Sequence, residues 1–221
     1  MNVEAAGEPA SAGVVTPFRQ FARAFAESKV AVGASVLLVL IVAIAILAPL
    51  LAPQDPYDLA QLDILDGKLP PGSESSAGYT YWLGTDDQGR DMLSGIMYGL
   101  RTSLLVGAGS AALAFALGTI LGLTAAYRGG LADTAIMRLV DLQLSFPAIL
   151  VALMILAVIG RGIMSVILAL VIVEWAYYAR VARAAALAER GREYIEAAQC
   201  LALPTRRVVF RHLLPNCLPP L

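Results

Sequence analysis

Few residues in this sequence have the types and spacing that catalysis or metal binding requires. Cys200 and Cys217 lack the spacing of a metal or redox motif, and one histidine, His212, is too few for a histidine-based metal site. The sequence contains no GxxxxGK[ST] phosphate loop and no nucleophile with an adjacent base. We therefore predict that the chain is not an enzyme and binds no metal or cofactor of its own.

Three ionisable residues lie within or beside apolar runs: Glu174, Arg138 and Asp141. A charged group at membrane depth avoids lipid and faces a bundle interior or a cavity. At about 1.5 Å per residue, Glu174 lies roughly 18 Å into its helix, with Tyr177 and Tyr178 as its expected hydrogen-bond partners. Arg138 and Asp141 lie one turn apart and are expected to pair. These three residues are candidates for a translocation path or gate, and a purely structural polar contact is the alternative.

The composition indicates that the elements carrying these residues are membrane helices. The chain has 221 residues, of which 58% are hydrophobic and 15% charged, whereas soluble domains have about 45–50% apolar and about 25% charged residues. The net charge of −1 gives no indication of nucleic-acid binding. We predict an all-α integral membrane protein with four spans, at about 30–53, 102–127, 142–160 (extended back to about 134) and 162–179.

The distribution of charge predicts the orientation of these spans. Aspartate is concentrated between the first two spans and arginine after the fourth, so the positive-inside rule places the first of these segments outside and the second in the cytoplasm. The first half of the chain then comprises a cytoplasmic N-terminal segment (1–29), the first span (30–53) and an extracytoplasmic loop (54–100). The second half comprises the second to fourth spans (101–187), a cytoplasmic region (188–216) and the start of a further span (217–221).

Short patterns predict local features of the second and third spans. Ala114, Gly118 and Gly122 recur at every fourth position, a spacing of small residues that allows close helix packing. Asp133 is the expected N-cap of the third helix, and Pro147 is expected to kink it because proline removes a backbone hydrogen bond.

The extracytoplasmic loop ends in a cluster of charged residues. Thr85 followed by Gln88 matches a capping box, with acidic residues in the first turn. A capped helix that leads into the second span is one interpretation. The other is an external rim that meets a partner or screens substrate, formed by Asp86, Asp87, Arg90 and Asp91.

The polar stretch 193–216 keeps helical spacing although it follows the fourth span. We predict two short helices, the first over about 189–202 and ended by Pro204, the second capped by Thr205. One face of the first helix is expected to carry Ile195, Ala198 and Leu201. Its small alanines allow another protein surface to approach closely. An interfacial helix on the membrane is the alternative, but its glutamates are unfavourable against an anionic leaflet, which favours a protein partner.

This stretch resembles the cytoplasmic loop of the membrane permease subunits of ATP-binding-cassette importers. The family pattern is Glu-Ala-Ala, three residues, a glycine and later a Leu-Pro ending, and it aligns here with "EAAQCLA" and "HLLPN". Ala202 stands where the family has glycine, which costs about 1 kcal/mol if the position requires a positive φ. The resemblance implies that an ATPase is contacted by Glu193, Glu196, Ala197, Ala198 and Ala202.

Further segments resemble the C-type permease subunit of dipeptide and oligopeptide importers, among them "LGTDDQGRDMLSGIMYG", "YRGGLADTAIMRLVDLQLSFP" and "YARVARAAAL". The resemblance implies a MetI-like bundle with two more spans beyond residue 221. It also implies a prokaryotic plasma-membrane location, a homologous permease partner, two ATP-binding subunits that hold ATP and magnesium, an extracytoplasmic substrate-binding protein and surrounding lipid.

Four functions follow from these observations. Import of short peptides leads, and the same architecture imports nickel complexes, glutathione, haem or oligosaccharides. A membrane scaffold that binds an ATPase without transport is a third hypothesis, and polar residues inside the spans disfavour it. An ion-driven carrier needs paired buried acids, which the sequence lacks.

Overall fold

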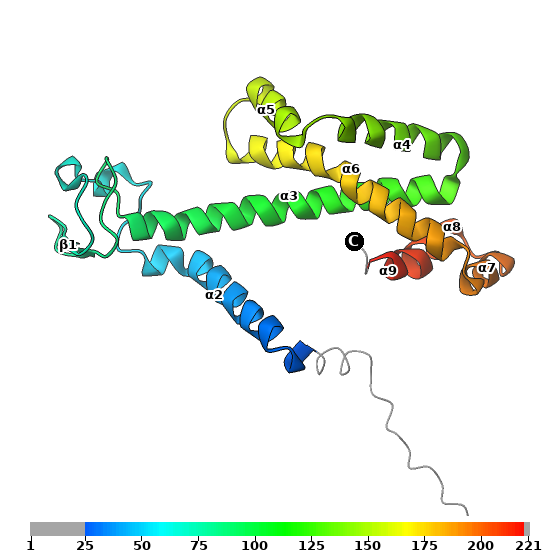
Figure 1. The fold of residues 1–221 in the computed structure, drawn as a ribbon, viewed down its shortest axis with the longest axis horizontal. Coiled ribbons are helices and arrows are strands. Elements are labelled where there is room, and N and C mark those ends of the chain that lie inside the picture. The colour runs from blue at the N-terminus through cyan, green and yellow to red at the C-terminus, as the bar shows by residue number, and fades with distance from the viewer. Residues whose placement is uncertain (1–24, 219–221) are drawn as a thin grey trace, which may run out of the picture. The chain divides into compact units, whose positions relative to one another are not determined.

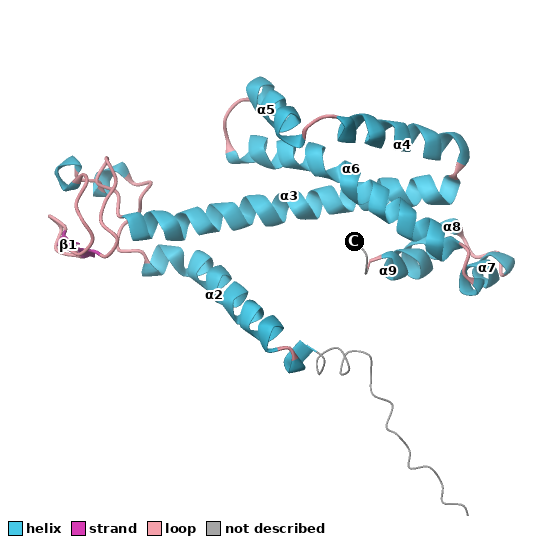
Figure 2. Cartoon of the chain, in the orientation of Figure 1, coloured by secondary structure: helices cyan, strands magenta, loops and turns pink. Residues whose placement is uncertain are grey.

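The structure is a computed structural model that describes residues 25–218. The predictions for 1–24 and 219–221, most of the N-terminal segment and the end of the further span, lie outside the described residues. The described part of the chain is mainly helical and contains a small two-stranded antiparallel hairpin (Figures 1 and 2). The chain divides into two compact units, Met1–Arg101 and Thr102–Leu221, which are described separately.

Within residues 25–218, three helices are long and apolar enough to cross a membrane: α2 (Lys29–Leu51), α3 (Met92–Arg128) and α6 (Ile163–Arg190). A fourth candidate span is the pair formed by α4 (Gly130–Ser145) and α5 (Ala148–Ile159). A lipid-embedded chain must satisfy its backbone groups internally, and uninterrupted helices do so. The predicted all-α membrane protein with four spans is confirmed if the bent pair counts as one span.

The α4–α5 pair is broken more sharply than the predicted kink. The two helices are bent by 92° at Phe146–Pro147, and Pro147 is the N-cap of α5. Asp133 is not the N-cap of α4, because Gly129 occupies that position and Asp133 lies in the first turn. The prediction of a proline bend is therefore confirmed, and the predicted cap is wrong.

In the first unit, a buried carboxylate organises the loop between α2 and α3. This loop contains η1 (Leu59–Gln61), η2 (Ile64–Asp66), β1 (Ser73–Glu74) and the antiparallel β2 (Thr80–Tyr81). The Asp66 carboxylate accepts from the Tyr81 hydroxyl at 2.9 Å, from the Ser76 amide at 3.1 Å and from the Ser75 hydroxyl at 3.2 Å. Burial raises the pKa of Asp66, but these hydrogen bonds outweigh burial and leave the pKa lowered.

Asp66→Asn is expected to destabilise this loop by about 2 kcal/mol at neutral pH, because a charged acceptor of several hydrogen bonds is lost. A lowered pKa stabilises the fold fully above the unfolded value of about 3.9, and that stabilisation is lost as the pH falls through the folded pKa. Thermal unfolding from pH 7 to pH 2.5 should therefore show a difference between wild type and variant that shrinks below about pH 4. A pH-independent difference contradicts the role of the charge.

The start of α3 is capped by a residue other than the predicted one. The Thr85 hydroxyl instead accepts from the Leu69 amide at 2.8 Å and donates to the Asp66 carbonyl. Asp91 precedes the helix and its carboxylate accepts from the Ser94 amide at 2.9 Å. The predicted capping box at Thr85 is wrong, because the helix begins after Asp91 and not after Thr85.

In the second unit, small residues bring α3 against α6 (Figure 1). A Cβ on Gly118 would clash with the Trp175 carbonyl, and one on Gly122 would clash with the Ala179 carbonyl and the Ala182 Cβ. Ala114 is fully buried on the same helix. The predicted packing role of the small-residue repeat is confirmed.

Candidate functional site

The C-terminal cluster consists of α7 (Glu193–Cys200), α8 (Thr205–Arg207), the π-helical η3 (Val208–Leu213) and α9 (Leu214–Cys217), packed on the ends of α3 and α6. Figure 1 shows these short helices beside the end of α6. Their shared core is apolar and contains Leu123, Ala126, Ala186, Ile195, Ala198, Val208, Leu213 and Cys217. The polar stretch that follows the fourth span is therefore held by its own chain.

One face of α7 is buried and the other is exposed. Ile195 is 1% exposed and Ala198 is 5% exposed, so both contribute to the core. Glu193, Glu196 and Ala197 are exposed on the remaining surface. The Ala198 side chain packs against its own chain, and its docking role stays a prediction.

Leu201 does not continue the buried face of α7. Its side chain is 75% exposed, because α7 ends at Cys200 and the chain turns. The prediction that it shares a face with Ile195 and Ala198 is wrong.

Ala202 has a left-handed backbone with φ of 51°. The Leu203 amide donates to the Ala198 carbonyl at 3.2 Å, the six-to-one bond of a Schellman motif, which places Ala202 at the C′ position where glycine is preferred. The position where the family has glycine is therefore one where the backbone requires a positive φ. Alanine meets it at a steric cost that glycine does not have.

Ala202→Gly is expected to stabilise the C-terminal cluster by about 0.5–1 kcal/mol, because glycine adopts the left-handed conformation without strain. Ala197→Gly is the matched control, since this exposed alanine lies within α7 and its replacement costs about 1 kcal/mol of helix propensity. Hydrogen–deuterium exchange of peptides covering 193–217 measures both effects. Faster exchange in Ala202→Gly contradicts the assignment of strain.

Polar contacts fix the cluster to the ends of α3 and α6. Arg190 donates to the Ala126 carbonyl at 2.9 Å, and its guanidinium lies 6.0 Å from the centre of the Tyr127 ring. The Tyr127 hydroxyl donates to the Thr205 hydroxyl at 3.3 Å. Thr205 is the first residue of α8, and the N-cap is Pro204. The prediction that Thr205 caps this helix is wrong.

A second set of contacts links α6 to α7. The Tyr194 hydroxyl donates to the Glu189 carboxylate at 2.6 Å. Burial, and then the Glu189 carboxylate, raise the pKa of Tyr194 to about 12. The phenol therefore stays protonated at neutral pH and keeps this hydrogen bond, which helps to fix the orientation of α7.

A hollow of about 390 Å³ lies between α4 and α6 and is lined by polar residues and one methionine: Asp133, Thr134, Met137, Arg138, Asp141, Arg180 and Arg183. Arg180 donates to Asp141 at 2.6 Å, and Arg183 donates from Nε and Nη2 to both oxygens of Asp133. The predicted Arg138–Asp141 pair is wrong, because Asp141 pairs with a residue of α6. Arg138 and Asp141 still line the same hollow.

Glu174 does not line this hollow. Its side chain is exposed, and within residues 25–218 its carboxylate has no hydrogen bond or ion pair. Tyr178 packs its ring edge-on against Phe115 at 5.7 Å and against Tyr177 at 6.0 Å. The predicted tyrosine partners of Glu174 are therefore wrong, and the structure separates Glu174 from the other two path candidates.

The four candidates for an external rim have different surroundings. Asp91 is 1% exposed and caps α3, while one Asp86 oxygen accepts from the Gln88 amide at 2.8 Å and from the Arg90 amide at 3.0 Å. Asp87 is exposed and lies 3.5 Å from the Lys68 ammonium. Asp87 is therefore the rim candidate with the most accessible carboxylate, and Asp86 and Asp91 chiefly shape the loop.

Sequence reasoning missed Gln54 and the cross-helix partners Asp133 and Arg183. The buried Gln54 side chain accepts from the Asp91 amide at 2.7 Å and donates to the Gln61 carbonyl at 2.8 Å. No local pattern marks such a glutamine. The spacing of Arg180 and Arg183 on one face of α6 was a usable signal, because it presents two guanidiniums to the same neighbour.

Comparison with known proteins places this geometry in context. Residues 118–221 match the family described as "Binding-protein-dependent transport system inner membrane component". Residues 16–71 match the N-terminal transmembrane domain of oligopeptide transport permease C. The two matches cover the first span and the part of the chain that contains α4, α6 and the C-terminal cluster.

Curated relatives are similar over most of the chain. The dipeptide transport system permease protein of Escherichia coli K12 is 41% identical over 207 residues, which cover 94% of this chain and 68% of that protein. The di/tripeptide transport system permease protein of Pseudomonas aeruginosa UCBPP-PA14 is 38% identical, with coverage of 93% and 67%. The glutathione transport system permease protein of Pectobacterium atrosepticum is also 38% identical, with coverage of 92% and 65%.

Proposed function

This chain belongs to the family of membrane permease subunits of ATP-binding-cassette importers for dipeptides and oligopeptides, and on that premise we propose that it forms part of the translocation path for short peptides. The proposal that the cargo is a short peptide rests on the relatives named for dipeptide, di/tripeptide and oligopeptide transport. The glutathione permease of similar identity supports glutathione, itself a small peptide, as the second candidate.

The exposed face of α7 is proposed to dock on a cytoplasmic ATP-binding subunit. Glu193, Glu196 and Ala197 are accessible while Ile195 anchors the opposite face in the core. A helix held this way moves with α6, so a force applied to α7 is transmitted to a span. The ATP-binding subunit with ATP bound then favours the permease conformation to which it binds more tightly. The size of this bias equals the difference between its binding free energies for the two conformations.

The proposed arrangement in the membrane has the N-terminus and the C-terminal cluster in the cytoplasm and the 54–100 loop outside. The arginines near the end of α6 and the aspartates of the loop support this arrangement through the positive-inside rule. The proposed partners are a homologous permease, two ATP-binding subunits and an extracytoplasmic binding protein. The scaffold hypothesis is disfavoured, since relatives are named as transport permeases.

Uptake by the assembled importer in proteoliposomes tests the cargo. With ATP inside and the binding protein outside, we expect uptake of labelled dipeptides and tripeptides, and competition by unlabelled peptide. Calorimetry with the binding protein alone identifies the preferred cargo independently of transport. Uptake of nickel complexes, haem or oligosaccharides without peptide uptake contradicts the proposal, and preference for glutathione supports the second candidate.

A further inference from the structure

The hollow between α4 and α6 carries more positive than negative charge. Three of its lining residues are arginines, Arg138, Arg180 and Arg183, and two are aspartates. Each aspartate is already in an ion pair with α6. Within residues 25–218, Arg138 has neither an ion pair nor a hydrogen bond to its guanidinium, so the hollow presents a free cation.

The paired arginines keep unused donors beside Arg138. Arg180 reaches Asp141 through Nη2, and Arg183 reaches Asp133 through Nε and Nη2. A guanidinium has five N–H donors, so both retain N–H groups for an additional anion. The hollow therefore fits an anion with several acceptor oxygens rather than a single point charge.

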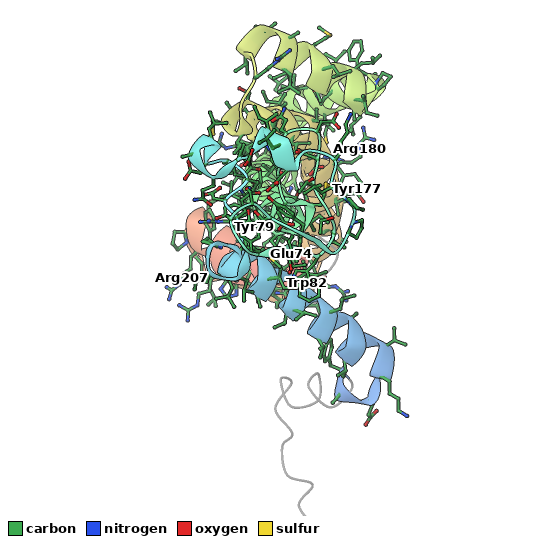
Figure 3. The ribbon with its side chains drawn as sticks, turned by 90° about the vertical axis from the view of Figure 1, so that its left-hand side faces the viewer. Glu74, Tyr79, Trp82, Tyr177, Arg180 and Arg207 are labelled. Atoms are coloured by element: carbon green, nitrogen blue, oxygen red, sulfur yellow. The ribbon has the colours of Figure 1, made fainter. Side chains whose placement is uncertain are left out.

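Apolar side chains occur on the two helices that form this hollow. Met137 of α4 lines the hollow itself, Leu142 of α4 is 62% exposed, and Tyr177 of α6 is 63% exposed. Figure 3 shows Tyr177 and Arg180 projecting from the same side of α6. Tyrosine and arginine at the end of an apolar run are typical of the level of lipid head groups. The hollow is thus open beside surfaces that suit acyl chains.

We propose that this hollow binds the phosphate of an anionic phospholipid. Guanidinium groups match phosphate in geometry and charge, and basic pockets between transmembrane helices bind phospholipid head groups. Arg138 provides the free cation, Arg180 and Arg183 provide further donors, and the acyl chains lie along Leu142 and Tyr177. The flanking apolar surfaces favour a lipid over the carboxylate of a transported peptide, which would not need them.

Native mass spectrometry of the assembled importer tests this proposal. After purification in detergent, the complex is mixed with phosphatidylglycerol, phosphatidylcholine or inorganic phosphate. We expect selective retention of phosphatidylglycerol by wild type, and a loss of about tenfold in affinity for Arg138→Gln. Arg138→Lys is expected to recover part of the affinity, since lysine binds phosphate as a point charge.

Arg161→Gln is the matched control, because Arg161 is an exposed arginine in the turn before α6, at the opposite end of that helix. We expect it to retain phosphatidylglycerol as wild type does. Equal retention of phosphatidylglycerol and phosphatidylcholine by wild type, or unchanged retention by Arg138→Gln, overturns the proposal. Displacement of bound lipid by short peptides at low concentration assigns the hollow to cargo instead, and equal affinity for inorganic phosphate excludes a contribution of the acyl chains.

Discussion

Glu196→Lys is expected to abolish ATP-driven uptake while the protein still inserts in the membrane. Glu196 lies on the exposed face of α7, whose opposite face is anchored by Ile195, so the substitution leaves the core unchanged. Reversing a charge buried at the proposed interface costs about 3 kcal/mol, or about a hundredfold in affinity for the ATP-binding subunit. Uptake in proteoliposomes and co-purification of that subunit measure the two effects.

Glu74→Lys is the matched control for this charge reversal. Glu74 is an exposed glutamate on β1 (Figure 3), and within residues 25–218 its carboxylate has no hydrogen bond or ion pair. We expect normal assembly and uptake for this variant. Normal uptake by Glu196→Lys would falsify the proposed docking of α7, whereas equal losses in both variants would indicate a general effect of added positive charge.

Gly122→Ala is expected to lower stability by about 2–3 kcal/mol, because the added methyl forces α3 and α6 apart. The clash involves the Ala179 carbonyl, a backbone atom, which cannot move without shifting α6. Interhelical packing of this kind provides much of the association energy between helices in lipid, where the hydrophobic effect does not act between them. Thermal unfolding in detergent measures the loss.

Gly107→Ala isolates the packing effect from helix propensity. Gly107 lies on the same helix, and among residues 25–218 a Cβ there would meet nothing within 4 Å beyond its chain neighbours and the backbone of its own helix. Alanine at this position should leave the unfolding temperature unchanged or raise it, since its helix propensity is higher by about 1 kcal/mol. Equal shifts in the two variants would show that α3 and α6 do not meet as the structure has them.

Much of the helical architecture could be predicted from the sequence. The spans follow from apolar runs of bilayer length, and the end of the first short polar helix follows from Pro204, which disfavours a helical conformation at Leu203. The bend at Pro147 follows from the chemistry of proline alone, although its size of 92° does not. These features depend on hydrogen bonds between residues that are close in the chain.

The start of α3 shows where local patterns are insufficient. Thr85 and Asp91 both carry a side-chain oxygen that is able to cap a helix. The loop decides between them, because the Thr85 hydroxyl is already used by the Leu69 amide and Asp91 is held by Gln54. That choice depends on contacts between segments that lie far apart in the sequence.

The sequence by itself determined the class of the protein, its spans, the polar helices after the fourth span and the resemblance to importer permeases. Only the tertiary structure decided which charges meet, pairing Asp141 with Arg180 and Asp133 with Arg183, and leaving Arg138 and Glu174 without partners among residues 25–218. The physical reason is distance along the chain. A helix satisfies its backbone within four residues, whereas an ion pair between α4 and α6 exists only after the two helices have packed side by side.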